Sequence, residues 1–158
     1  MQAKPLTMTT RFSMLLLGAT FLAFGGAGQA LAVSGVIEKN SASDFEQTVQ
    51  KLKQNVTANK LVLLKEFNHQ MMVKMVGVHA DKSMVFEIFH PRYGKVINAK
   101  DRSAFMVAPL RILVQQDGSK VIVRYQQASV LFKPYKGLGD LGNELDTVLG
   151  RIVDAATK

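Results

Sequence analysis

Cysteine is absent from this chain of 158 residues, and histidine occurs only three times. Without cysteine the protein forms no disulfide, has no thiolate nucleophile, and holds neither an iron–sulfur cluster nor a cysteine-ligated zinc ion. In an oxidising compartment its stability must therefore come from its packed core alone.

Motifs typical of enzymes are also missing. The chain has no G-x-S-x-G and no P-loop, and no acidic pair stands in a recognisable acid–base context. Gly137, Gly139 and Gly142 have the G-x-G-x-x-G spacing, but they follow no strand of a βαβ unit. The sequence therefore assigns no catalytic residue and no cofactor, and it favours a protein without enzymatic activity.

Clustered positive charge is lacking despite a formal net charge of +8. Lysine and arginine are scattered along the chain with no run of three. Such a basic balance suits anionic membrane surfaces, acidic partners or simply solubility, and we expect no nucleic acid partner.

The start of the chain has the pattern of an export signal. Lys4 and Arg11 precede an apolar region over 14–24, and Ala30-Leu31-Ala32 supplies the small residues that a signal peptidase requires. We therefore expect residues 1–32 to be a signal peptide that is cleaved before Val33, and the mature protein to be periplasmic.

A retained membrane anchor is the alternative, because residues 14–33 carry no charge. Four glycines and Gln29 make that stretch a poor span, so we expect no stable membrane span after cleavage. The mature chain, residues 33–158, keeps a net charge of +6, because both charges of the signal are positive. Its length predicts a single domain.

Residues 84–125 are the best-defined part of that domain. An apolar run over 84–89 stops at His90-Pro91, where we expect a turn. Residues 111–114 and 121–125 are rich in β-branched and aromatic side chains, and Asp117-Gly118 lies between them. This pattern predicts a β-hairpin, because glycine readily takes the positive φ of a tight turn. We expect three strands of one sheet here.

Before this stretch, strand and helix patterns alternate. A strand over 35–40 is followed by a helix that begins with a capping box, Ser43-x-x-Glu46, and ends near Asn59. The nearly continuous apolar run over 61–67 predicts a second strand, buried on both faces over its first half.

The other elements are mostly helical. Asn68 is expected to cap a short helix through Met75. We also expect a short helix that stops before Pro109, helical turns over 128–135, and a final helix from about Asn143 after a glycine-punctuated loop. Together these elements predict an α+β domain with a mainly antiparallel sheet and helices on one face.

A homodimer is expected, because two helices cannot cover every apolar strand residue. The apolar strand residues in question are Val85, Ile88, Ile112, Val114, Ile122 and Val123. We expect Ile112, Val114 and the Met71–Met75 segment to lie in or near the interface.

Several different short motifs are distributed along nearly the whole mature chain. They are F-x-I-F-x-P-x-x-G over 86–94, P-L-R-I-L-V over 109–114, D-G and V-x-Y within 117–125, Asn68-His69, and Tyr135-Lys136-Gly137-Leu138. Together they resemble the Domain of Unknown Function 302 family over residues 36–155. That resemblance implies a compact α+β domain, commonly a homodimer whose sheets come together and hold a small molecule. It implies no activity, because the family has none assigned.

The chain departs from the family's pattern at three places. His90-Pro91 stands where the family has Asn-Pro, and Ala108 stands where it has leucine before Pro-Leu. Met71 and Met72 replace small residues after the family's Asp-His. A site built on the family's asparagine or aspartate therefore need not carry over.

The histidines raise the question of a metal site. His69, His79 and His90 show no H-x-x-x-H spacing, and a zinc site needs three or four ligands, so zinc is disfavoured. Copper is a better candidate, because soft Cu(I) accepts imidazole together with thioether. The ligands of such a site would be His69, Met72, Met75 and His90. A methionine stripe at helical spacing is more often core or a dimer surface.

Two strand ends supply the candidate ligand-binding residues. His69 directly follows a strand and belongs to the family-like motif, although a capping or structural histidine is the simpler interpretation. His90 also follows a strand, and Arg92 and Tyr93 are suited to grip an anionic ring or a carboxylate unless they form a plain solvated turn. We predict an exported accessory protein that binds a small molecule or a partner through these four residues. A periplasmic protein that handles copper or another metal is the alternative.

Overall fold

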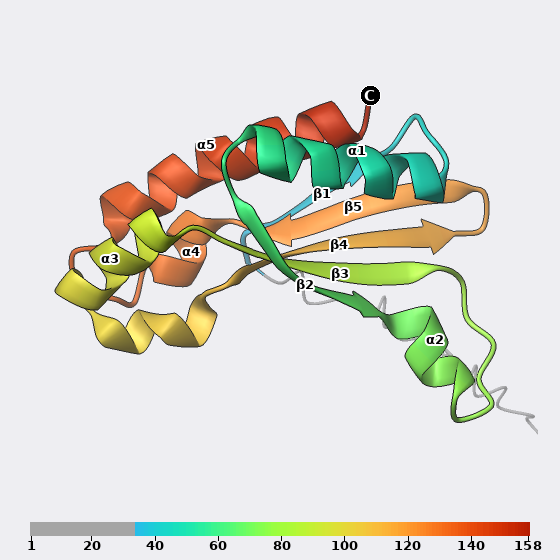
Figure 1. Ribbon diagram of the computed structural model, residues 1–158, viewed down its shortest axis with the longest axis horizontal. Coiled ribbons are helices and arrows are strands. Elements are labelled where there is room, and N and C mark those ends of the chain that lie inside the picture. Colours follow the sequence, from blue (N-terminus) through green and yellow to red (C-terminus); the bar gives the residue numbers. More distant parts are fainter. Residues whose placement is uncertain (1–33) are drawn as a thin grey trace, which may run out of the picture. The chain divides into compact units, whose positions relative to one another are not determined.

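The computed structural model describes residues 34–158, and the predicted signal peptide lies outside them. The predicted α+β class is confirmed, because five antiparallel strands form one sheet in the order β1-β5-β4-β3-β2 (Figure 1). The elements in chain order are β1 (Val36–Asn40), α1 (Phe45–Ala58), β2 (Val62–Asn68), α2 (His69–Lys74), β3 (Ser83–Phe89), α3 (Pro91–Lys100), the 3₁₀ helix η1 (Arg102–Val107), β4 (Leu110–Asp117), β5 (Lys120–Gln126), α4 (Ala128–Phe132) and α5 (Gly139–Ala156).

The three strands predicted within 84–125 are confirmed as β3, β4 and β5. β4 and β5 form the expected hairpin, with Asp117 opposite Lys120 and a two-residue loop between them. Gly118 in that loop has a φ of +56°, the conformation that the Asp-Gly pair predicted.

Helices α1 and α5 lie side by side over one face of the sheet (Figure 1). The apolar stripe predicted for α5 is buried there, together with alternate residues of the central strands. The fully buried side chains of this core include Phe86, Ile88, Ile112, Val114 and Val123 from the strands and Leu52, Val56, Leu149 and Ile152 from the helices. At roughly 1.5–3 kcal/mol for each large buried side chain, this layer is the main source of stability in a chain without disulfides.

Ile112 and Val114 do not lie in a dimer interface themselves, because both are fully buried within a single chain. That they lie near one stays a prediction. The period of two along β4 puts them on the face that α1 and α5 cover. Ile88 and Val123 are buried in the same core. The Met71–Met75 part of the interface stays a prediction.

Strand β2 lies at the edge of the sheet, and its predicted burial on both faces is wrong. Val62 and Leu64 are 46% and 51% exposed. An edge strand has a neighbour on one side only, and the pairing with β3 is also irregular between Leu63 and Lys65.

The predicted capping box of α1 is wrong, because Asp44 and not Ser43 caps the helix. The Asp44 carboxylate accepts a hydrogen bond from the backbone N–H of Gln47 at 2.8 Å. Glu46 turns away and pairs with Lys82. Serine and aspartate cap helices about equally well, so the local sequence did not decide between neighbouring candidates.

Two further helix boundaries differ from the prediction. The turn expected at His90-Pro91 is the start of α3, with Pro91 in the first helical position. Helix α5 begins at Gly139, ahead of the predicted Asn143, so Gly139 and Gly142 belong to a helix and not to a loop.

The shorter predicted helices are confirmed. Asn68 caps α2 by accepting a hydrogen bond from the backbone N–H of Met71 at 2.9 Å. Helix η1 ends just before Pro109, and α4 lies within the predicted 128–135. Within residues 34–158, the structure contains no helix that combines the length and the apolar character needed to cross a membrane.

Candidate ligand-binding groove

The face of the sheet opposite α1 and α5 is the open face, defined by the residues that alternate with the buried ones. By the strand register these residues include Val36 and Glu38 of β1, Arg124 and Gln126 of β5, Arg111, Leu113 and Gln115 of β4, Val85 and Glu87 of β3, and Lys65 and Phe67 of β2. Apolar and charged side chains are mixed on this face.

A groove of about 420 Å³ crosses the open face beside η1 and α4. Aliphatic side chains from five elements line it, namely Val36, Val85, Leu113, Val107 and Leu131, and Pro109 joins them where the chain enters β4. A volume in this range fits a small organic molecule, and an apolar lining with few polar groups is typical of small-molecule sites.

Two arginines supply the polar part of the groove. Arg111 contacts Glu87 through Nε at 3.0 Å and through Nη2 at 2.9 Å. Arg124 contacts Glu38 through Nε at 2.6 Å and Gln115 through Nη1 at 2.7 Å. These contacts orient both guanidinium groups, although the Arg111 side chain is 70% exposed, and use two of the three nitrogens of each. The third nitrogen of each remains as a donor for an anionic or polar group of a ligand.

The wall of the groove at η1 is held by Asp101. Its carboxylate accepts hydrogen bonds from the backbone N–H and the hydroxyl of Ser103, at 3.0 and 2.5 Å, and from the backbone N–H of Lys136 at 3.2 Å. The Ser103 side-chain bond is the main cause that lowers the pKa of Asp101 below its ordinary value. Asp101 thus fixes η1 to the segment between α4 and α5 while it is ionised.

His90, Arg92 and Tyr93 are brought together, but they satisfy one another. The Nδ1 atom of His90 accepts a hydrogen bond from the backbone N–H of Arg92 at 2.9 Å, so His90 is the N-cap of α3. Arg92 donates to the Tyr93 hydroxyl at 2.8 Å and pairs with Glu144 of α5 at 2.6 Å. Tyr93 is 7% exposed. This cluster fastens α3 to α5, and Arg92 already has its anionic partner.

His69 lies far from that cluster. It follows Asn68, which pairs with Met84 at the start of β3, whereas His90 follows the last residue of β3. At ~3.3 Å per strand residue the two histidines are roughly 20 Å apart. The alternative copper site, with His69, Met72, Met75 and His90 as ligands, therefore does not converge. Among residues 34–158, no three His, Cys, Asp or Glu side chains gather to hold a metal ion.

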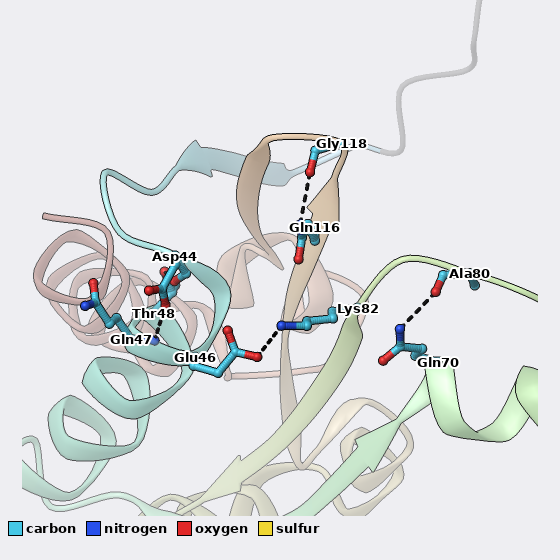
Figure 2. A network of polar contacts seen from close by, with 9 residues as sticks. All are labelled: Asp44, Glu46, Gln47, Thr48, Gln70, Ala80, Lys82, Gln116 and Gly118. Atoms are coloured by element: carbon cyan, nitrogen blue, oxygen red, sulfur yellow. Dashed lines mark hydrogen bonds and ion pairs between the residues drawn. The ribbon is translucent and has the colours of Figure 1, made fainter.

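A second hollow, of about 410 Å³, lies between α1 and the strands β2 and β3. Lys82 at its border pairs with Glu46 (Figure 2), and this contact is the main cause that lowers the pKa of the Glu46 carboxyl. Lys53 on the same border pairs with Glu66 at 2.6 Å. Each cation of this hollow is engaged by a neighbouring carboxylate, so it is a weaker candidate for an anion site.

The groove residues were not predicted from the sequence, although the alternation of side chains along β4 contains part of the signal. The alternation along β4 separates Arg111 and Leu113 from the core residues Ile112 and Val114. What the alternation does not reveal is that Arg124, Val36 and η1 meet at the same place, because that depends on strand order.

Comparison with known proteins gives the family and a structural relative. A family model described as "Domain of unknown function DUF302" matches residues 37–156. The crystal structure of an uncharacterized conserved protein DUF302 from Bacillus stearothermophilus superimposes with a TM-score of 0.72 at 13% identity, covering 80% of this chain and 100% of the other. At that identity the likeness shows a common fold. No curated protein matches the chain.

Proposed function

The chain belongs to the family of the domain of unknown function DUF302, and we propose that it is an exported binding protein that holds a small amphipathic molecule in the groove of its open sheet face. The molecule has an apolar body and a polar or anionic end. It is bound without being chemically changed.

The observation that carries this proposal is the pairing of aliphatic walls with two guanidinium groups, each oriented by a neighbouring carboxylate, in one groove. Val85 and Leu113 offer an apolar floor, and Arg111 and Arg124 flank it with donors that their carboxylate partners hold in position. Burying apolar surface favours binding, and the arginines orient the polar end of the ligand.

A pair of fluorescent probes with similar aromatic bodies tests the groove. 8-Anilinonaphthalene-1-sulfonate is anionic, and N-phenyl-1-naphthylamine is neutral. We expect both to bind saturably with about one site per chain, and Leu113→Lys to abolish the binding of both because it fills the floor with a charged chain. Arg111→Gln should weaken the anionic probe at least fivefold and leave the neutral probe unchanged.

The matched control is Leu64→Lys, which places the same charge on an exposed leucine of β2 that does not line the groove. It should bind both probes like the unaltered protein. If Leu64→Lys and Leu113→Lys lost probe binding equally, the groove would not be a specific binding site. Probe fluorescence that fails to saturate in all variants would contradict it as well. Native mass spectrometry of the protein from its own source would then be expected to show no organic adduct.

Export is part of the same proposal, supported by the charge and small-residue pattern before Val33. Mass spectrometry of the mature protein should give Val33 as its first residue. The full-length chain in the membrane fraction would contradict cleavage.

A further inference from the structure

Helix α2 and its C-cap residue expose three methionines that pack into no core. Met71, Met72 and Met75 are 64%, 49% and 81% exposed, and α2 has no buried residue. Figure 1 shows α2 beyond the end of the sheet, away from α1 and α5. Their exposure rules out core packing as the reason for these methionines within the single chain.

Two of the thioethers lie on the same side of α2. Met75 follows Met71 by four residues, which places their Cβ atoms about 5–6 Å apart on adjacent turns. Methionine has three rotatable side-chain bonds, so two sulfur atoms at this spacing can turn toward a common point.

The chain that returns from α2 brings an imidazole to the same hollow as Met71. After Met75 the backbone reverses, with Gly77 N–H bonded to the carbonyl of Lys74 at 3.0 Å. The Gln70 side chain donates to the carbonyl of Ala80 at 3.0 Å and holds this return segment against the helix (Figure 2). As a result His79 and Met71 line one hollow of about 380 Å³.

We propose that Met71 and His79, which line this hollow, and Met75, which lies one turn further along and outside its lining, form a binding site for a soft monovalent metal ion such as Cu(I). Thioether sulfur and imidazole nitrogen are the donors that Cu(I) accepts. Among residues 34–158, no carboxylate lines this hollow, whereas Mg²⁺ and Ca²⁺ require oxygen ligands. Lys74 also lines it, and its positive charge opposes a divalent ion more than a monovalent one.

This site differs from the copper set expected from sequence. His90 is excluded by its distance, Met71 replaces Met72, and His79, which the sequence left without a role, takes the place of His69. The site is also separate from the groove of the open sheet face, whose lining residues belong to other segments. Metal binding at Met71, Met75 and His79 therefore does not depend on whether the groove binds a ligand.

Silver(I) tests the site, because it has the softness and charge of Cu(I) and is stable in air. Tag-free protein is titrated with silver nitrate in chloride-free buffer by calorimetry. We expect one Ag(I) per chain, at least tenfold weaker binding in the double variant Met71→Leu/Met75→Leu, and a similar weakening in His79→Asn. Leucine keeps the size and apolar character of methionine and removes only the sulfur.

The matched control is Met106→Leu, which removes an 85% exposed methionine of η1. It should bind silver like the unaltered protein. In protein labelled at the methionine methyl groups, NMR should show the Met71 and Met75 signals shifting with Ag(I) while the Met106 signal stays.

Equal silver affinity in the unaltered protein and in Met71→Leu/Met75→Leu would overturn the site. If Met106→Leu lost as much silver affinity as Met71→Leu/Met75→Leu, the site would be overturned too. Silver would then bind to any exposed thioether. The substituted side chains are exposed, so circular dichroism should show that Met71→Leu/Met75→Leu folds like the unaltered protein. A weaker silver affinity in this variant then reflects the lost sulfur atoms and not a loss of structure.

Discussion

At the scale of single residues, Tyr125 shows how burial turns a side chain into a pH-dependent contribution to stability. It is 7% exposed, and burial first, then the nearby Asp146 charge, raise the pKa of its hydroxyl above the ordinary 10.0. Above pH 10 the unfolded chain therefore loses this proton before the folded chain does. The folded state then binds more protons, so its stability falls as the pH rises.

Tyr125→Phe is expected to remove this alkaline loss. The free energy of unfolding, measured by urea denaturation between pH 8 and 11, should fall less steeply above pH 10 in the variant than in the unaltered protein. At pH 8 the difference in the free energy of unfolding between the variant and the unaltered protein reflects only the loss of the hydroxyl group. Parallel curves across the whole range would contradict a raised pKa at this residue.

The candidate site residues show that the role of a side chain depends on contacts with residues that are distant in the sequence. His90, Arg92 and Tyr93 were correctly seen as a group at a strand end, but the structure makes them a helix cap and a link to Glu144. Their role as ligand-binding residues stays a prediction. Sequence could not show that Glu144, more than 50 residues away, already engages Arg92.

At the scale of elements, the contact between α4 and α5 depends on the absence of a side chain. A Cβ at Gly142 would lie 2.7 Å from Cα of Ser129 and 3.1 Å from its backbone nitrogen. Asp146 of α5, one turn further on, accepts hydrogen bonds from the backbone N–H groups of Ala128 and Ser129 at 2.6 and 3.3 Å. Helix α5 thus caps the start of α4, and both contacts require close approach.

Gly142→Ala is therefore expected to destabilise the protein by about 1–3 kcal/mol, because backbone atoms must move to admit the methyl group. Gly139→Ala is the matched control, because a Cβ at Gly139 meets nothing within 4 Å. It should be neutral or stabilise α5 by up to ~1 kcal/mol. Thermal and urea unfolding of both variants test this, and equal stability of the two would contradict the close approach.

At the scale of the whole molecule, we propose that two copies pair through their open sheet faces and close the groove between them. Charges of both signs alternate on that face, with Glu38 beside Arg124 and Glu87 beside Arg111. A two-fold pairing can match such a face with itself. Val85 and Leu113 would supply the apolar centre of the contact.

Sedimentation velocity at micromolar concentration tests the pairing. We expect a dimer for the unaltered protein and for Leu64→Lys, and a monomer for Leu113→Lys, because the new charge would be buried at the centre of the contact. A strictly monomeric unaltered protein would contradict the dimer. Probe binding by such a monomer would leave the groove proposal standing, so the two proposals fail separately.

The sequence by itself determined the elements whose signals are local. A period of two with Asp117-Gly118 between the runs is enough for the β4–β5 hairpin, and the apolar stripe of α5 is enough for a helix buried on one side. Family membership followed from the same stretches, because their motifs are contiguous along the chain.

Only the tertiary structure decided which positions work together. In the folded chain Asp44 and not Ser43 caps α1, and Ile112 and Val114 are buried under two helices. Strand β2 lies at the edge of the sheet. The tertiary structure also separated His69 from His90 by the length of β3 and placed His79 and Met71 around one hollow. Periodicity shows which face a residue occupies, but strand order and register decide which distant residues share that face, and binding sites are made by such distant neighbours.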